Sequence, residues 1–156
     1  MHSRKLKYHE YLCRYSNCPP DFYKNIDIDS FRWVFREDLL SSFKPLNLIK
    51  EPPQRMLDDT DSLCKGYGLS FFNSFENCKG RYKSLYKKKR NQSHQDFILD
   101  KGNSIAELKL NKDGGIYGDL NVSNGHYTFH ECKQTDLSKK IVNIVEIFDE
   151  NGNFKW

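Results

Sequence analysis

Residues 105–131 read IAELKLNKDGGIYGDLNVSNGHYTFHE. Strand-like runs occupy 105–110, 116–122 and 126–131, and they are separated by Asp113-Gly114-Gly115 and by Asn124-Gly125. Asp-Gly and Asn-Gly pairs are favoured in tight hairpin turns because both positions tolerate positive φ. The stretch therefore predicts a meander of three antiparallel strands.

Three further segments outside this stretch have strand character. The run FRWVFRE at 31–37 alternates aromatic and other residues, 66–72 is short and apolar, and 141–148 (IVNIVEIF) is the most apolar run of the chain. A period of two places Phe31, Trp33 and Phe35 on one face and Arg32 on the other.

One helix is expected at 75–89. Ser74 is a suitable N-cap, and the apolar residues after it recur at helical spacing. Few strands lead directly into helices, which excludes a doubly wound fold. The sequence thus predicts an α+β class with a mainly antiparallel sheet and a few helices. We expect residues 31–156 to form one domain, preceded by an appendage at 1–30 that is a candidate partner-docking segment.

Between the first two strands, residues 38–63 contain Pro45, Pro52 and Pro53 and an acidic cluster at Asp58, Asp59 and Asp61. We expect a loop with little regular structure. Loops of this length are uncommon in compact domains and are often functional.

The composition is that of a folded domain. Of the 156 residues, 37% are hydrophobic and 14% aromatic, which is too many for a disordered chain. No run approaches the roughly 18 consecutive apolar residues of a membrane span. The basic start MHSRKLKYHEYL lacks the apolar stretch of a secretory signal. We therefore expect a cytoplasmic protein without membrane contact.

The five cysteines are Cys13, Cys18, Cys64, Cys78 and Cys132. We expect all five to stay reduced and to act as small buried hydrophobic residues. Cys13 and Cys18 have a zinc-like spacing, but no second pair completes four ligands, so no metal site is expected.

Basic residues are concentrated in residues 79–90, where Lys79, Arg81, Lys83, Lys87, Lys88, Lys89 and Arg90 occur. Such a run attracts phosphates, which makes Lys87, Lys88, Lys89 and Arg90 a candidate nucleic-acid surface. Cations at a helix C-terminus also suit the macrodipole, so a solvated helix end is the alternative.

Common catalytic motifs are absent from the sequence: it has no P-loop, no HExxH and no GxSxG. Instead, short pieces follow one another in a distinctive order. They are Phe31-Arg32-Trp33-Val34, Gly68-Leu69-Ser70-Phe71-Phe72, Ile105-Ala106-Glu107-Leu108, Gly125-His126-Tyr127-Thr128 and the closing strand 141–148. Over about residues 31–148 this pattern resembles a family of small bacterial proteins.

That family in turn resembles the ADP-ribosyltransferase-like fold. The resemblance implies an Arg on a first strand, matched by Arg32, and a Gly-hydrophobic-Ser-aromatic motif before a helix, matched by Gly68–Phe72. It also implies a third catalytic group on a late strand, often Glu. The matching strand offers His126 and Tyr127, with Glu131 further on, so the third group is not identified.

The resemblance implies NAD as the substrate. Arg32, Ser70 and His126 are the candidate catalytic residues, and the candidate cofactor-binding residues are Arg32, Gly68, Leu69, Ser70, Phe72 and Tyr127. An Arg and exposed backbone N–H groups suit a pyrophosphate. Tyr67, Phe71 and Phe72 are candidates to line a slot for the nicotinamide ring.

Each candidate also has a structural interpretation. Arg32 could pair with the acidic cluster at 58–61, Ser70 could simply point outward, and His126 could cap the hairpin. For Glu107, the explanation that the pattern favours is an exposed charge on an edge strand.

The leading hypothesis is an NAD-dependent ADP-ribosyltransferase that acts as a bacterial toxin or phage-defence effector. RNA is the favoured acceptor, and an antitoxin protein is a candidate partner. The rival hypothesis is a non-enzymatic binding module in a toxin–antitoxin or defence complex. The first hypothesis predicts that Arg32 and His126 face one cleft with Gly68–Phe72, and that both can be replaced by Ala without unfolding the domain.

Overall fold

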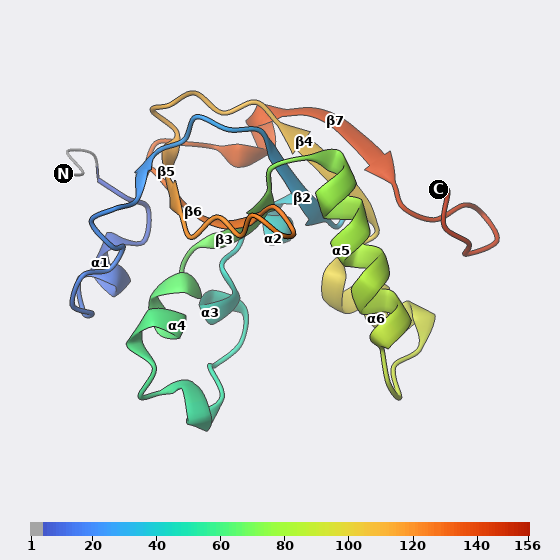
Figure 1. Cartoon of the computed structure of the whole chain (residues 1–156), viewed down its shortest axis with the longest axis horizontal. Helices are drawn as coiled ribbons and strands as arrows, with labels where there is room; N and C mark the ends of the chain where they lie inside the picture. Colours follow the sequence, from blue (N-terminus) through green and yellow to red (C-terminus); the bar gives the residue numbers. More distant parts are fainter. Residues whose placement is uncertain (1–4) are drawn as a thin grey trace.

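The computed structural model describes residues 5–156 and contains one sheet of seven strands (Figure 1). Every pairing is antiparallel, and the strand order is β1-β5-β6-β3-β2-β4-β7. The strands are β1 Lys24–Asn25, β2 Ser30–Val34, β3 Leu69–Phe72, β4 Ser104–Leu108, β5 Gly115–Gly118, β6 His126–Glu131 and β7 Ile141–Glu146.

Six α-helices and two short 3-10 helices accompany the sheet within residues 5–156. They are α1 His9–Leu12, α2 Leu39–Ser42, α3 Leu46–Ile49, η1 Gln54–Met56, α4 Thr60–Lys65, α5 Phe75–Lys88, α6 His94–Lys101 and η2 Leu137–Lys140. The α+β class with an antiparallel sheet is thereby confirmed. No helix in this part of the chain has the length and apolar character needed to cross a membrane.

All six predicted strand segments overlap an observed strand, and the predicted helix at 75–89 corresponds to α5. Ser74 caps α5 as expected, since its hydroxyl accepts a hydrogen bond from the backbone N–H of Asn77 at 3.0 Å. The observed strands are mostly shorter than the predicted ones. For example, β5 ends at Gly118, directly before Asp119, whose φ of 57° lies in the left-handed region.

The predicted meander is only half right. β5 and β6 form the expected hairpin, in which Tyr117 pairs with Phe129. β4 does not pair with β5 and lies instead between β2 and β7. Four of its five residues are buried, which suits an inner strand of the sheet. The Asp113-Gly114-Gly115 turn therefore ends a connection that carries the chain from β4 to a distant position in the sheet, because turn chemistry reverses the chain without choosing its neighbour.

Regular structure also occurs where none was predicted. The segment 38–63, expected to be irregular, holds α2, α3, η1 and most of α4. Asp59 belongs to the acidic cluster and caps α4 by accepting from the N–H of Ser62. The helix α6 begins at a similar cap, in which the Ser93 hydroxyl accepts from the N–H of Asp96.

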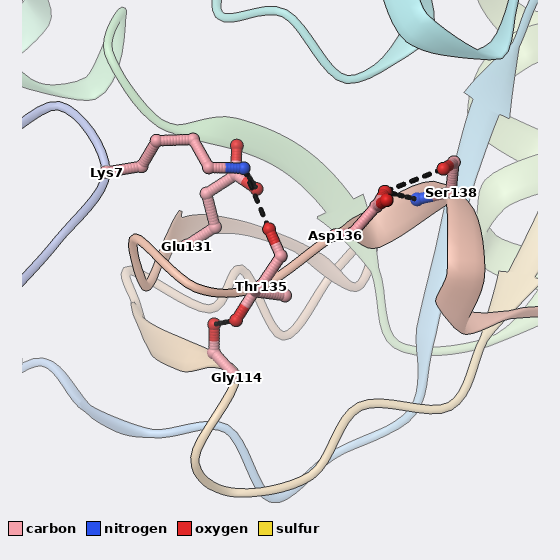
Figure 2. Close-up of polar contacts among 6 residues, drawn as sticks. All are labelled: Lys7, Gly114, Glu131, Thr135, Asp136 and Ser138. Atoms are coloured by element: carbon pink, nitrogen blue, oxygen red, sulfur yellow. Dashed lines mark hydrogen bonds and ion pairs between the residues drawn. The ribbon is translucent and has the colours of Figure 1, made fainter.

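The N-terminal segment packs into the domain. Residues 1–4 of the predicted appendage lie outside the described part, but residues 5–30 contribute β1 and the buried side chains of Leu6, Leu12, Tyr23 and Ile26. The Lys7 ammonium donates to the Glu131 carboxylate at 2.7 Å and to the Thr135 carbonyl at 2.8 Å. Both contacts are drawn in Figure 2. These hydrogen bonds hold the N-terminal segment against the end of β6 and the residues that follow it.

Two of the five cysteines are oxidised, so the expectation that all are reduced is wrong. Cys18 and Cys64 form a disulfide across 46 residues, which joins the N-terminal segment to α4. Cys13 is free and exposed, whereas Cys78 is free and buried. Among residues 5–156, no group of His, Cys, Asp and Glu side chains is placed to hold a metal ion.

The two faces of the sheet belong to different core clusters. One face carries Val34, Leu69, Phe71, Ala106, Tyr127 and Phe129, and the other carries Phe72 and Ile105 together with Cys78, Tyr82 and Phe97 of α5 and α6. The helix α5 lies against β2, β3 and β4 (Figure 1). Alternation along each strand thus assigns every candidate site residue to one of two faces.

Candidate functional site: a cationic cleft where two central strands separate

Backbone pairing in the sheet is shortest between β2 and β3. These neighbours pair at a single position, Phe31 with Phe72, whereas β2 pairs with β4 over five residues. Beyond that position the Arg32 guanidinium bridges the strands: its NH1 group donates to the Ser70 carbonyl at 2.7 Å and Nε donates to the Ser42 carbonyl at 2.9 Å. A side chain thus replaces the interrupted backbone ladder.

A cleft of about 460 Å³ opens at this separation. The strands supply Arg32, Trp33, Leu69, Ser70 and Phe72 to its wall. The segment from α2 to β3 supplies Ser41, Ser42, Lys44, Leu46, Asn47, Ile49, Met56, Ser62, Lys65, Gly66 and Gly68, while α6 adds Asp100 and Lys101. The segment 38–63 therefore builds a wall of the cleft.

The cleft carries a positive charge. It is lined by four basic side chains, those of Arg32, Lys44, Lys65 and Lys101, and by one carboxylate, that of Asp100. This carboxylate pairs with Lys101 at 3.5 Å. Leu46, Ile49 and Met56 add apolar surface. This combination suits an anionic ligand that also has an apolar or flat part.

The Arg32 guanidinium makes its hydrogen bonds to groups of the protein. Besides its two carbonyl partners, its guanidinium lies 6.0 Å from the centre of the Phe71 ring. Burial lowers the pKa of Arg32 to about 10, so the side chain remains charged at pH 7. No ion pair joins it to the acidic cluster at 58–61 within the described residues, and that alternative for its role is wrong.

Ser70 and His126 form a hydrogen-bonded pair. The Ser70 hydroxyl lies 2.9 Å from Nε2 of His126, on the neighbouring strand β6. His126 also packs against Phe72, with ring centroids 5.5 Å apart. Ser70 itself is exposed and lines the cleft.

Arg32 and His126 project from opposite faces of the sheet. Arg32 is opposite Ala106, which belongs to the core of one face, while His126 is opposite Phe72, which belongs to the core of the other. The prediction that both side chains face one cleft is therefore wrong. Both contact Ser70 nonetheless, Arg32 at its carbonyl and His126 at its hydroxyl.

Several predicted binding residues belong to the core instead. Tyr127 is fully buried, and its hydroxyl lies 2.8 Å from that of Ser30. Phe71 is fully buried too, and Tyr67 stacks on Tyr11 at 5.1 Å, so these two aromatic residues do not line a slot for a ring. Leu69 and Phe72 are each only 3% exposed, although both reach the cleft wall.

Gly68 is required for packing between strands. A Cβ atom there would lie 2.8 Å from Cγ2 of Thr128 and 3.0 Å from the Phe129 carbonyl oxygen, both on β6. The glycine thus lets β3 approach β6 closely.

Comparison with known proteins yields no relative. No protein-family model, no curated protein and no solved structure matches this chain. The ADP-ribosyltransferase-like resemblance therefore remains a prediction, and the site is interpreted from its own geometry.

Sequence reasoning missed the three lysines of the cleft. Lys44, Lys65 and Lys101 come from three separate segments and share no motif. Lys65 follows Cys64 of the disulfide, and Lys101 ends α6. Their convergence depends on long-range packing, which no local spacing reveals.

His126 is expected to titrate below its ordinary range. Burial lowers its pKa, and the charges of Lys65, Arg81 and Arg32 lower it further. A depressed folded-state pKa contributes stability above the unfolded value of about 6.5, and this contribution is lost as the pH falls through the folded value. An NMR titration of the His126 ring should give a midpoint below that of a peptide containing residues 123–129. A midpoint equal to or above the peptide value would contradict the burial argument.

Proposed function

We propose that the cleft binds NAD and that the protein is an ADP-ribosyltransferase. The observation that supports this most is the positive cleft at the separation of β2 and β3, with its apolar wall. A dinucleotide needs both features, because its pyrophosphate is anionic and its bases are flat and largely apolar. In this proposal Lys44 and Lys65 contact the phosphates, and Trp33 and Phe35 offer aromatic surface to a base.

The reaction would exchange one glycosidic bond for another. The bond between the ribose carbon and the nicotinamide nitrogen breaks, and nicotinamide leaves as a neutral base with the bonding electrons. An acceptor nucleophile forms the new bond to the ribose carbon and loses its proton. Ser70 lines the cleft, and its hydroxyl is hydrogen-bonded to His126, which is neutral at pH 7. We therefore propose that this pair positions the acceptor nucleophile and receives its proton.

Nucleic acid is the acceptor that we propose, RNA ahead of DNA. Lys87, Lys88 and Arg90 are exposed at and just beyond the end of α5, whereas Lys89 lies over the Tyr86 ring at 4.4 Å. Two earlier cations of the run have partners within the protein: Lys79 pairs with Glu76, and Lys83 donates to the Trp156 carbonyl. A toxin or defence role with an antitoxin partner belongs to the same proposal.

A combined binding and turnover experiment tests this function. We expect NAD to bind the purified chain in calorimetry, nicotinamide to be released, and label from adenine-labelled NAD to appear on RNA in a cell extract. Replacing both Lys44 and Lys65 by Ala should weaken NAD binding by about tenfold or more, since bonds to charged groups contribute about 1.5–3 kcal/mol each.

The matched control is Lys88→Ala, which removes an exposed lysine outside the cleft. It should leave NAD affinity unchanged. If NAD does not bind, or if the control weakens binding as much as the cleft variant, the proposal is wrong.

The structure also favours one alternative, a binding module without turnover. The single cleft carboxylate in the described part of the chain, Asp100, is paired with Lys101, and Arg32 already donates to two carbonyls. Little remains to stabilise positive charge on a ribose. NAD or ADP-ribose binding without nicotinamide release would favour this alternative.

A further inference from the structure

A second pocket lies beside α5, on the face of the sheet that this helix covers. It has a volume of about 320 Å³ and is lined by Phe31, Phe75, Ile105, Glu107, Asn143 and Val145. None of these residues lines the cationic cleft. The strands that form its floor are β2, β4 and β7, which are neighbours at one end of the sheet (Figure 1).

Strand register sets the arrangement of the floor. Phe31 is opposite Glu107, and Glu107 is opposite Asn143, so these three form one row across β2, β4 and β7. Ile105 and Val145 are opposite each other in the next row on the same face. The pocket floor is thus apolar except for the carboxylate and the amide of one row.

Glu107 occupies an unusual place for a charge. The sequence suggested an exposed charge on an edge strand, but β4 is an inner strand and Glu107 is half-buried. Within residues 5–156 its carboxylate makes no hydrogen bond or ion pair to a side chain. A half-buried carboxylate on an apolar floor favours a cation from outside, because ionic attraction strengthens as water is excluded.

Two aromatic rings, those of Phe31 and Phe75, line the same pocket as this carboxylate. Phe75, the first residue of α5, meets Phe31 edge to face with ring centroids 6.4 Å apart. Trp156 does not line the pocket but packs against Phe75, with ring centroids 5.2 Å apart. The ammonium of Lys79 is 5.7 Å from the centres of both Phe75 and Trp156, so these rings already attract a cation from within the protein.

We propose that this pocket binds a small organic cation, an ammonium group on a compact apolar body. The ammonium would contact Glu107 and the ring faces, and the apolar body would cover Ile105 and Val145. The carboxylate disfavours anions, and the volume suits a free small molecule. This inference does not depend on NAD binding in the cationic cleft.

Choline and its uncharged analogue 3,3-dimethylbutan-1-ol form a matched pair of probes, since they differ mainly in the charge of the head group. Titration of the full chain, followed by NMR and by tryptophan fluorescence, should show choline binding about tenfold more tightly than the alcohol. The shifted signals should belong to the pocket residues. Equal affinity of the two probes, or no binding of choline, overturns the proposal.

Two variants and a control locate the site. Glu107→Gln keeps the side-chain size and should abolish the preference for choline, while Phe75→Leu should weaken choline binding severalfold. Glu150→Gln removes one exposed carboxylate outside the pocket and should change nothing. Circular dichroism melts verify folding, and a Glu107→Gln protein that is folded and still prefers choline overturns the assignment.

A peptide side chain is the competing occupant. A short peptide containing trimethyl-lysine carries the same head group as choline. Affinity within about threefold of choline supports recognition of the head group alone, as we propose. A peptide that binds far more tightly overturns the commitment to a free small molecule and assigns the pocket to a protein partner.

Discussion

Reduction of the Cys18–Cys64 disulfide is expected to lower the free energy of unfolding by about 3–4 kcal/mol. The bond closes a loop between residues 46 positions apart, and a cross-link of that span removes much conformational freedom from the unfolded chain. This is a large part of the stability of an ordinary domain, which is about 5–15 kcal/mol. Urea denaturation with and without reductant measures the difference.

The same bond should also affect the cationic cleft. Cys64 lies in α4 beside Lys65 and Gly66, both of which line the cleft. Asn47 ties α3 to this region, because its side chain donates to the Leu63 carbonyl at 2.9 Å and its N–H donates to the Gly66 carbonyl at 3.0 Å. Loss of the disulfide therefore loosens the wall that carries Leu46 and Ile49.

A double variant with Ser at positions 18 and 64 should reproduce the effect of reductant. The control is Cys13→Ser, which alters an exposed free cysteine and should change stability by less than about 0.5 kcal/mol. A double variant as stable as this control would show that the bond contributes nothing.

The disulfide also shows what the sequence could not reveal. Five cysteines without regular spacing gave no reason to pair any two, and the pairing depends on how the N-terminal segment folds onto α4. Disulfides are typical of oxidising compartments. The cysteines therefore do not support the expected cytoplasmic location, which is a reducing environment.

Local chemistry predicted the elements well. At Asn124-Gly125 the glycine has φ 74°, and a Cβ atom there would collide with the side chains of Asn73 and Asn77, so only glycine fits the hairpin. The helix α6 was missed although Ser93 and Asp96 have the spacing of a helix N-cap. This capping pattern by itself indicates a helix that begins after Ser93.

Strand order and the cleft were beyond local reasoning. The position of β4 between β2 and β7 follows from burial on both of its faces, which the alternating pattern IAELKL conceals. Arg32 and Ser70 were found through short motifs, and they do meet at the separation of β2 and β3. The cleft lysines Lys44, Lys65 and Lys101 could be identified only from the tertiary structure.

Arg32→Ala is expected to destabilise the protein by at least about 3 kcal/mol. The guanidinium makes two charge-assisted hydrogen bonds, to the carbonyls of Ser42 and Ser70, and each such bond contributes about 1.5–3 kcal/mol. No other part of the β2–β3 boundary replaces them, because these strands pair at one position only. We therefore expect a marked loss of stability, in contrast to the sequence-based expectation that this variant stays folded.

Arg36→Ala is the matched control for that variant. Arg36 lies four residues further along the chain, is exposed, and forms a surface ion pair with Glu146 at 3.2 Å. Surface pairs contribute at most about 1 kcal/mol, so its replacement should shift the urea midpoint only slightly. Arg32→Lys should fall between the two, because an ammonium lacks the planar fork that reaches both carbonyls at once. If Arg32→Ala and Arg36→Ala unfold at the same urea concentration, Arg32 does not join α2 to β3, and its donors are then available to a ligand in the cleft.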